Sequence, residues 1–148
     1  MENKVSYEKD VIQVKLLNVT KHPFYIAKIF AVVSDCGVNV DMISKVTLED
    51  QSLIEFTCHL RDADKLNKAI QLLKQEHPTL EIFQSTKYAK LHVEGTAMKE
   101  SVGVATKLFH LLASNDITFY QVTTSDTSIT YLVDKDKIEQ AVACVEGR

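Results

Sequence analysis

Glycine is scarce in this sequence, and its scarcity excludes several kinds of enzyme. Only four glycines occur among 148 residues, and none of them stands in a GxGxxG or GxxxxGK arrangement. Loops of that kind cradle the phosphates of nucleotides and dinucleotides, so we expect no such cofactor. The four are Gly37, Gly95, Gly103 and Gly147.

Cysteine and histidine are also too few or too scattered to build a metal site. The three cysteines, Cys36, Cys58 and Cys144, lie far apart without a CxxC pair, which favours reduced structural thiols over disulfides or zinc. The five histidines show no HExxH or similar ligand spacing. We therefore predict that the protein carries neither metal nor cofactor.

Long apolar runs and an excess of positive charge are missing too. No stretch approaches the roughly 20 apolar residues of a membrane span, and the N-terminal MENKVSYEKD has no apolar secretion signal. The net charge is −3 and the sequence pI about 5.9, whereas a nucleic-acid-binding face is normally basic. We expect a cytoplasmic protein that binds neither membrane nor nucleic acid.

What the chain does contain is a repeat. The stretch KIFAVVSDCGVNVDMIS (Lys28–Ser44) is followed later by the similar KLFHLLASNDITFYQVT (Lys107–Thr123). A repeat at a fixed spacing indicates two similar structural modules. The matching positions are Lys28 with Lys107, Phe30 with Phe109, Val38 with Ile117, Val40 with Phe119 and Ile43 with Val122.

Hydrophobic periodicity and turn residues predict the same order of elements in each module. In the first module, one helix begins at Pro23 and stops at Gly37, and a second is capped by Asp62 and ends before Pro78. In the second module, Ser101 and Asp134 are the predicted caps of the two helices. Strands are predicted at 11–19, 38–46, 52–60, 80–86, 89–95, 117–123 and 128–133.

This order, βαββαβ, is the ferredoxin-like plan. The second module lacks its fourth strand, whereas residues 3–7 have no place in the first. Because an unpaired sheet edge is a hazard, we expect this N-terminal segment to cross over and complete the second sheet. The predicted fold class is α+β: two ferredoxin-like βαββαβ modules with antiparallel sheets, interlaced through the N-terminal strand. The first module covers residues 9–87, and the second covers 88–148 plus 1–8.

Two other classes of function find little support. RNA-recognition domains share the βαββαβ order, but they stack bases on aromatics of a basic central strand, where this chain has LIEFTCHL. The carboxylate pairs Asp62/Asp64 and Asp134/Asp136 stand at predicted helix starts, where capping explains them without catalysis.

Longer stretches of the sequence carry a family resemblance. LLNVTKHPFYIAKIFAVVSDCGVNVDMIS is similar to the strand, loop and helix that run into an N-I-x-V-D-L/M-I strand in the first of the paired ACT domains of aspartokinases. VEGTAMKESVGVATKLFHLLASNDITFYQVTTSD resembles the second module, with its V-G-x-x-M strand, its helix and its T-S loop. The resemblance covers nearly all of the chain and implies two ACT modules of the aspartokinase C-terminal region.

That resemblance implies regulation without catalysis. Such modules bind an end-product amino acid, commonly lysine or threonine, and so exert allosteric feedback control on aspartate-family amino-acid biosynthesis through a separate kinase domain. We expect that kinase domain to be absent here, so the chain is an excised regulatory region, a separate small subunit or a stand-alone sensor. The implied partners are a small-molecule amino acid, a second copy in a homodimer and, as a further option, a kinase subunit in trans.

The predicted effector site centres on the loop that opens the first helix. Unpaired N–H groups and the positive end of the helix dipole suit a carboxylate there. The resemblance aligns Asp41 with an aspartate that contacts the ligand's ammonium group, although a solvent-facing strand residue is the alternative. The predicted effector-binding residues are Thr20, Lys21, His22, Phe24, Tyr25, Ile26, Asn39, Val40, Asp41, Met98 and Thr118.

Several residues depart from the family pattern. Lys21 replaces an acidic residue, and Phe24 adds bulk where glycine usually follows proline. In the second module, Val102-Gly103 replaces Pro-Gly, and Thr118 replaces an asparagine. These departures leave a second hypothesis open, a ligand-free ACT-type assembly module that mediates dimerisation.

Overall fold

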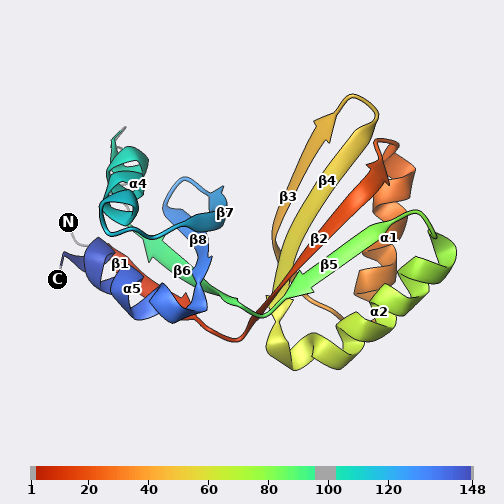
Figure 1. Cartoon of the computed structure of the whole chain (residues 1–148), viewed down its shortest axis with the longest axis horizontal. Coiled ribbons are helices and arrows are strands. Elements are labelled where there is room, and N and C mark those ends of the chain that lie inside the picture. The colour runs from red at the N-terminus through yellow and green to blue at the C-terminus, as the bar shows by residue number, and fades with distance from the viewer. Residues whose placement is uncertain (1–2, 96–102, 148) are drawn as a thin grey trace. The chain divides into compact units, whose positions relative to one another are not determined.

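The chain folds into two compact units, shown in Figure 1. The computed structural model describes residues 3–95 and 103–147. The first unit is Asp10–Thr86, and the second combines Met1–Lys9 with Lys87–Arg148. The chain therefore starts in the second unit, enters the first at Asp10 and returns after Thr86.

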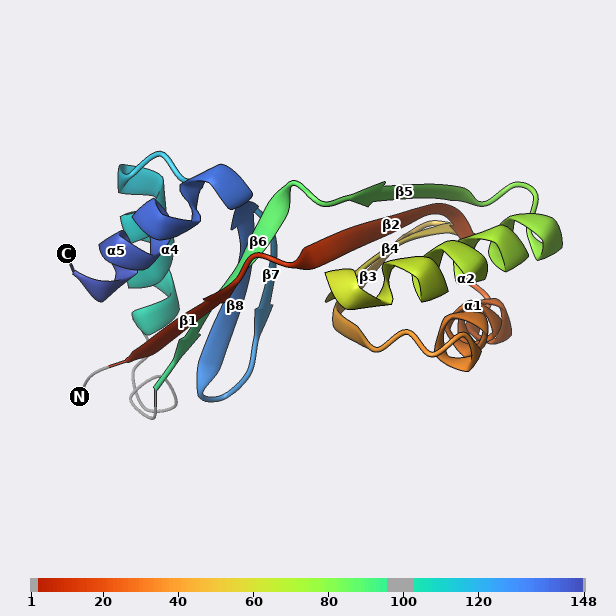
Figure 2. The ribbon, with the colours of Figure 1, turned by 90° about the horizontal axis from the view of Figure 1, so that it is seen from below.

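The first unit is a four-stranded antiparallel sheet with both helices on one face (Figure 2). The strand order β3-β4-β2-β5 leaves β3 and β5 at the edges. Alternate residues of the inner strands, such as Ile12, Val14 and Leu16, are buried in its core. Its elements are β2 (Val11–Thr20), α1 (Pro23–Asp35), β3 (Val40–Leu48), β4 (Gln51–His59), a 3-10 helix (Leu60–Asp62), α2 (Ala63–Glu76) and β5 (Glu81–Ser85).

The second unit repeats this plan with one strand taken from the N-terminus. Its antiparallel order is β1-β6-β8-β7, so β1 occupies the edge that β5 occupies in the first unit. Its own buried core includes Leu91, Leu112 and Ile129. The elements are β1 (Lys4–Glu8), β6 (Tyr88–Glu94), α4 (Val104–Ser114), β7 (Phe119–Thr124), β8 (Ser128–Asp134), a 3-10 helix (Lys135–Lys137) and α5 (Ile138–Glu146).

The predicted crossover of the N-terminal strand is confirmed. β1 pairs antiparallel with β6, with Val5 opposite Val93, and Val5 packs against the core of the second unit. Just after the strand, Lys9 Nζ donates to Glu139 Oε1 on α5 at 2.7 Å. This hydrogen bond raises the pKa of Lys9 and lowers the pKa of Glu139. The N-terminal segment is thus held by a sheet ladder and by an ion pair to the same unit.

The sequence predicted the boundaries of the helices better than their side-chain capping hydrogen bonds. Pro23 stands at the start of α1, and Gly37, with φ 88°, follows its end, as predicted. Asp62 occupies the N-cap position of α2 and Asp134 that of the second 3-10 helix, as predicted, but neither side chain makes a capping hydrogen bond. Asp134 instead accepts from Tyr120 Oη, and the predicted cap Ser101 lies outside the described residues. None of the described helices is both long and apolar enough to cross a membrane.

The two cores differ at one equivalent aromatic position. In the first unit Phe30 and Phe56 lie 5.7 Å apart, and in the second Phe109 and Tyr131 lie at the same distance. Tyr131 is fully buried, and its hydroxyl has no hydrogen-bond partner among the described residues. Burial raises the pKa of Tyr131, so the hydroxyl stays neutral.

Tyr131→Phe is therefore expected to stabilise the second unit. Removing a buried hydroxyl that has no partner saves its desolvation cost, on the order of 1 kcal/mol. For a chain of this size the gain corresponds to a rise in Tm of about 2–4 °C. Scanning calorimetry measures it, with Phe56→Tyr as the reverse change in the first unit. A lower Tm in Tyr131→Phe would show that the hydroxyl does have a partner.

Candidate functional site

The loop between β2 and α1 is closed by its own histidine. His22 precedes Pro23, and its Nδ1 accepts from the N–H of Phe24 at 3.2 Å. The carbonyl of His22 accepts from Tyr25 at 3.0 Å and from Ile26 at 3.4 Å. The prediction of unpaired N–H groups in this first turn is wrong, because proline has none and the next three are used within the chain. What remains for an anion is the positive end of the helix dipole.

The aromatic residues of this loop point in different directions. Phe24 is 73 % exposed, and its ring stacks against His22 with centroids 5.8 Å apart. Tyr25 is half-buried and meets His77 edge-on, with centroids 4.6 Å apart. Ile26 packs against the core of the first unit. Phe24 is thus the apolar side chain that the loop offers to a ligand or to another surface.

Lys21 already has a partner. Its Nζ lies 3.3 Å from Asp50 Oδ1 in the turn between β3 and β4, and both side chains are largely exposed. Thr20 pairs with Gln51 at the same end of the sheet, so the loop and the turn lie together, as Figure 1 shows. An exposed ion pair of this kind contributes little to stability and can open to admit a carboxylate.

The other predicted residues of the first unit, Asn39, Val40 and Asp41, lie at the start of β3. Asn39 N–H donates to Asp62 Oδ2 at 3.3 Å, and this hydrogen bond gives the buried carboxylate a partner. The backbone oxygen of Asp41 accepts from the buried Thr57 hydroxyl at 3.2 Å, while the Asp41 side chain is exposed. A bulge follows, with Met42 at φ 51°. A bulge beside an exposed carboxylate is a way to re-aim a side chain on an edge strand.

Within one copy of the first unit, Asp41 and the loop between β2 and α1 do not lie together. Asp41 lies opposite Thr57 on β4, whereas Thr20 lies opposite Gln51. At about 3.3 Å per residue the two places are about 20 Å apart along β4. β4 also separates β3 from β2, so Asp41 is not on the strand that adjoins the loop.

Two predicted residues belong to the second module, and the geometry of the first unit does not test them. Met98 lies outside the described residues, and Thr118 is exposed just before β7 of the second unit. Three residues with defined roles near the predicted site were missed: Asp50, Asp62 and His77. The sequence predicted Asp62 only as a helix cap, and nothing in the local sequence marks Asp50 or His77, because each acquires its role through a contact with a distant segment.

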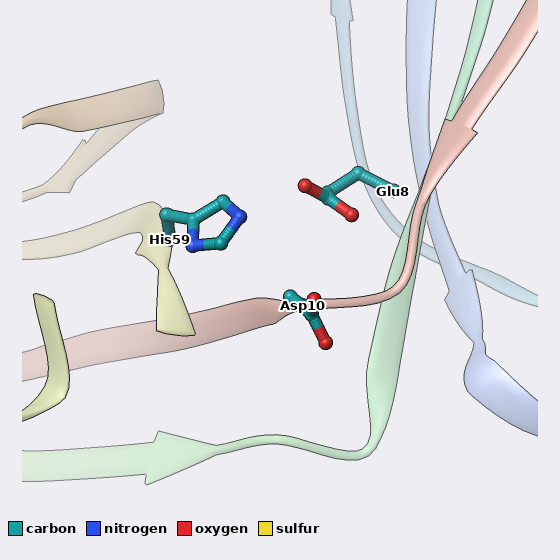
Figure 3. A group of neighbouring side chains, drawn as sticks. All are labelled: Glu8, Asp10 and His59. Carbon is teal, nitrogen blue, oxygen red and sulfur yellow. The ribbon is translucent and has the colours of Figure 1, made fainter. Parts of the chain in front are cut away.

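One further group of polar side chains is drawn in Figure 3. Asp10 and His59 flank the pairing of β2 with β4 in the first unit and offer ligand-type atoms within 4.8 Å of one another. His59 Nδ1 accepts from the Arg61 N–H at 3.0 Å, which caps the 3-10 helix that follows. The figure also labels Glu8, the last residue of β1 in the other unit. This role of His59 is structural, and we assign no ion to the group.

Comparisons with known proteins give the architecture its class. Residues 91–148 match the family model of the ACT domain. The regulatory subunit of aspartate kinase from Thermus thermophilus, in its ligand-free form, superposes with a TM-score of 0.88 at 23 % identity, over 97 % of this chain and 95 % of that one. Residues 91–148 of the second unit thus match an ACT domain, and the whole chain has the same fold as the regulatory subunit with which it superposes.

A curated relative and a further solved structure are also similar to this chain. Aspartate kinase from Pseudomonas fluorescens is 26 % identical over 139 residues, which cover 93 % of this chain and 34 % of the relative. Aspartokinase III of E. coli, in complex with lysine and aspartate, matches with a TM-score of 0.68 at 17 % identity, over 99 % of this chain and 32 % of that one. The chain spans about a third of the length of the curated relatives it matches. Along nearly its whole length it is similar to that third of these aspartokinases.

Proposed function

We propose that this protein is a non-catalytic regulatory module that binds an amino acid of the lysine or threonine type and controls an aspartokinase by feedback. Support comes from the match to a regulatory subunit and from the lysine complex of aspartokinase III. The kinase activity would belong to another domain or to a subunit in trans. The chain's own contribution is to bind the effector and to change shape or assembly in response.

The observation that carries this proposal is the separation between the Thr20–Tyr25 loop and Asp41, the two parts of the predicted effector site. An amino acid is only a few ångströms long, so it cannot reach from the loop at Thr20–Tyr25 to Asp41 within one first unit. A site that uses both groups needs a second copy. The proposed function therefore includes a homodimer.

The edge strand β3 supplies a way to build that dimer. Antiparallel pairing of two β3 strands across a two-fold axis places the start of each strand beside the end of the other. Asp41 of one copy then lies near the β3–β4 turn and the adjoining loop of the other. The strand also exposes apolar side chains that such a contact would cover, namely Ile43, Val46 and Leu48.

In this arrangement each group has a chemical role. The Asp41 carboxylate accepts hydrogen bonds from the ligand's ammonium group. The positive end of α1 and the nearby Lys21 favour the ligand's carboxylate. Binding stabilises the paired arrangement only by its differential affinity for that state, and this difference is the regulatory signal.

Thermal unfolding of the full chain tests the proposal. We expect one of lysine, threonine and methionine to raise Tm, and unrelated amino acids to leave it unchanged. At about 100 times Kd a ligand adds roughly 2.7 kcal/mol of stability, which corresponds to about 5–10 °C in Tm. A flat response to all of them would remove the sensor function.

A ligand-free assembly module is the second candidate. It is favoured by the first turn of α1, whose N–H groups are used within the chain, and by Phe24, which stands exposed at the loop. On this reading Phe24 and the β3 edge are contact surfaces only. The thermal scan separates the two, because an assembly module shows a Tm that depends on protein concentration and on no amino acid.

A further inference from the structure

His77, a residue outside the predicted site, contacts the loop between β2 and α1 through Tyr25. The ring of Tyr25, in the first turn of α1, meets His77 edge-on at 70°, with centroids 4.6 Å apart. His77 ends α2 and opens the connection to β5, and its side chain is 12 % exposed. The aromatic contact therefore ties the first turn of α1 to an element that follows it by some fifty residues in the sequence.

The same connection also touches the strand that enters the loop. Asn18 Nδ2, at the bulge of β2, donates to the carbonyl of Thr79 at 3.5 Å. The connection is closed on itself by a hydrogen bond from Leu80 N–H to the His77 carbonyl at 3.0 Å. The α2–β5 connection thus contacts β2 just before the Thr20–Tyr25 loop and Tyr25 at the end of that loop.

The nitrogens of His77 make no contribution that its ring contact with Tyr25 requires. His77 Nε2 is buried and has no hydrogen-bond partner among the described residues, and Glu76 Oε2 lies 3.9 Å away. A buried nitrogen without a hydrogen bond lowers stability. Phenylalanine would give the same ring contact without that loss. The ring contact with Tyr25, and not the nitrogens, is therefore the feature that carries a positioning role.

We propose that His77 is a positioning residue of the effector loop. By holding the Tyr25 ring, it fixes the first turn of α1 in the geometry that an amino-acid effector meets. His77 itself touches no effector in this proposal and acts through Tyr25. The inference rests on the proposed function, since it names a residue that supports that same site.

The test compares four forms of the full chain with the wild type. His77→Ala removes the ring, His77→Leu keeps the bulk without the ring in case alanine unfolds the unit, and His77→Phe keeps the ring without the nitrogens. His110→Ala changes an exposed histidine of α4 in the other unit and is the matched control. Two quantities are measured: the NMR signals of the Tyr25 ring without ligand, and the Kd for L-lysine and L-threonine by calorimetry.

We expect His77→Ala and His77→Leu to shift the Tyr25 ring signals. We also expect both to raise the Kd for the amino acid by about 3- to 10-fold, since an unrestrained side chain must be ordered on binding. His77→Phe restores both quantities to within twofold of the wild type, and His110→Ala alters neither. A merely structural histidine would lower Tm in the variants but leave the Kd of the folded fraction unchanged.

The two measurements distinguish a failure of the positioning role from a failure of the proposed function. Unchanged Tyr25 signals in His77→Leu, or shifted signals with an unchanged Kd, overturn the positioning role. If the wild-type chain binds neither amino acid, the proposed function fails, and the ring signals alone still decide whether His77 orders Tyr25.

Discussion

Asp41→Ala is expected to lose amino-acid binding and to keep its fold. The Asp41 side chain is exposed, and the hydrogen bond from Thr57 goes to the backbone oxygen, which alanine retains. A hydrogen bond between charged groups contributes about 1.5–3 kcal/mol, so the affinity should fall by about 10- to 150-fold. Calorimetric titration with lysine and threonine measures the loss, and circular dichroism checks the fold.

The control for this change is Asp126→Ala, which removes an exposed carboxylate between β7 and β8 of the second unit. It should bind like the wild type. Equal affinity of Asp41→Ala and Asp126→Ala would exclude Asp41 from the site.

Mixing two variants that are each expected to weaken binding tests whether the site is shared between copies. Asp41→Ala and Tyr25→Ala alter the two groups that lie at opposite ends of the first unit. After subunit exchange, half of the dimers are mixed, and each mixed dimer holds one intact shared site, so about a quarter of the sites recover. No recovery would place the ligand within a single copy and contradict the dimer geometry.

Removal of residues 1–8 is expected to unfold the second unit. β1 contributes five residues to the sheet and packs Val5 against the core of that unit. At about 1 kcal/mol net for each ladder hydrogen bond, the loss is about 5 kcal/mol, before the exposure of Val5 is counted. A domain has only about 5–15 kcal/mol of stability in all. The first unit owns none of these contacts and should stay folded.

Amide NMR spectra of the truncated chain, followed through urea unfolding, measure this outcome unit by unit. Signals from 87–148 should lose their dispersion, while those from 10–86 keep theirs. A chain shortened by residues 1–2 alone, which precede β1, is the matched control. If the larger truncation unfolds with the control's urea midpoint, β1 is dispensable and the interlaced fold is not cooperative.

The repeat and the turn residues made most of the fold predictable. Pro23 and Gly37 bound α1 because their backbone preferences act over one or two residues. The fourth strand that the second module lacked, together with the unplaced residues 3–7, predicted that this segment completes the second sheet, which β1 does by pairing with β6. Local propensity and the count of strands were sufficient for both.

The side-chain partners were not predictable in the same way. Asp62 and Asp134 stand at helix starts, yet Asp62 accepts from Asn39 and Asp134 accepts from Tyr120. In each case a distant segment supplies a donor that competes with the helix for the carboxylate. His22 shows the opposite case, since a histidine not marked as a cap closes the first turn of α1.

The sequence by itself determined the order of the elements, the duplication of the module and the crossing of the first strand, because periodicity, turn chemistry and an unpaired sheet edge are properties of the chain. Only the tertiary structure decided where the candidate site residues stand. The order β3-β4-β2 inserts a strand between Asp41 and the loop at Thr20, and the parallel run of β2 and β3 sends them to opposite ends of the sheet. Strand order and register arise from long-range packing, so residues that one motif aligns can lie a sheet's length apart.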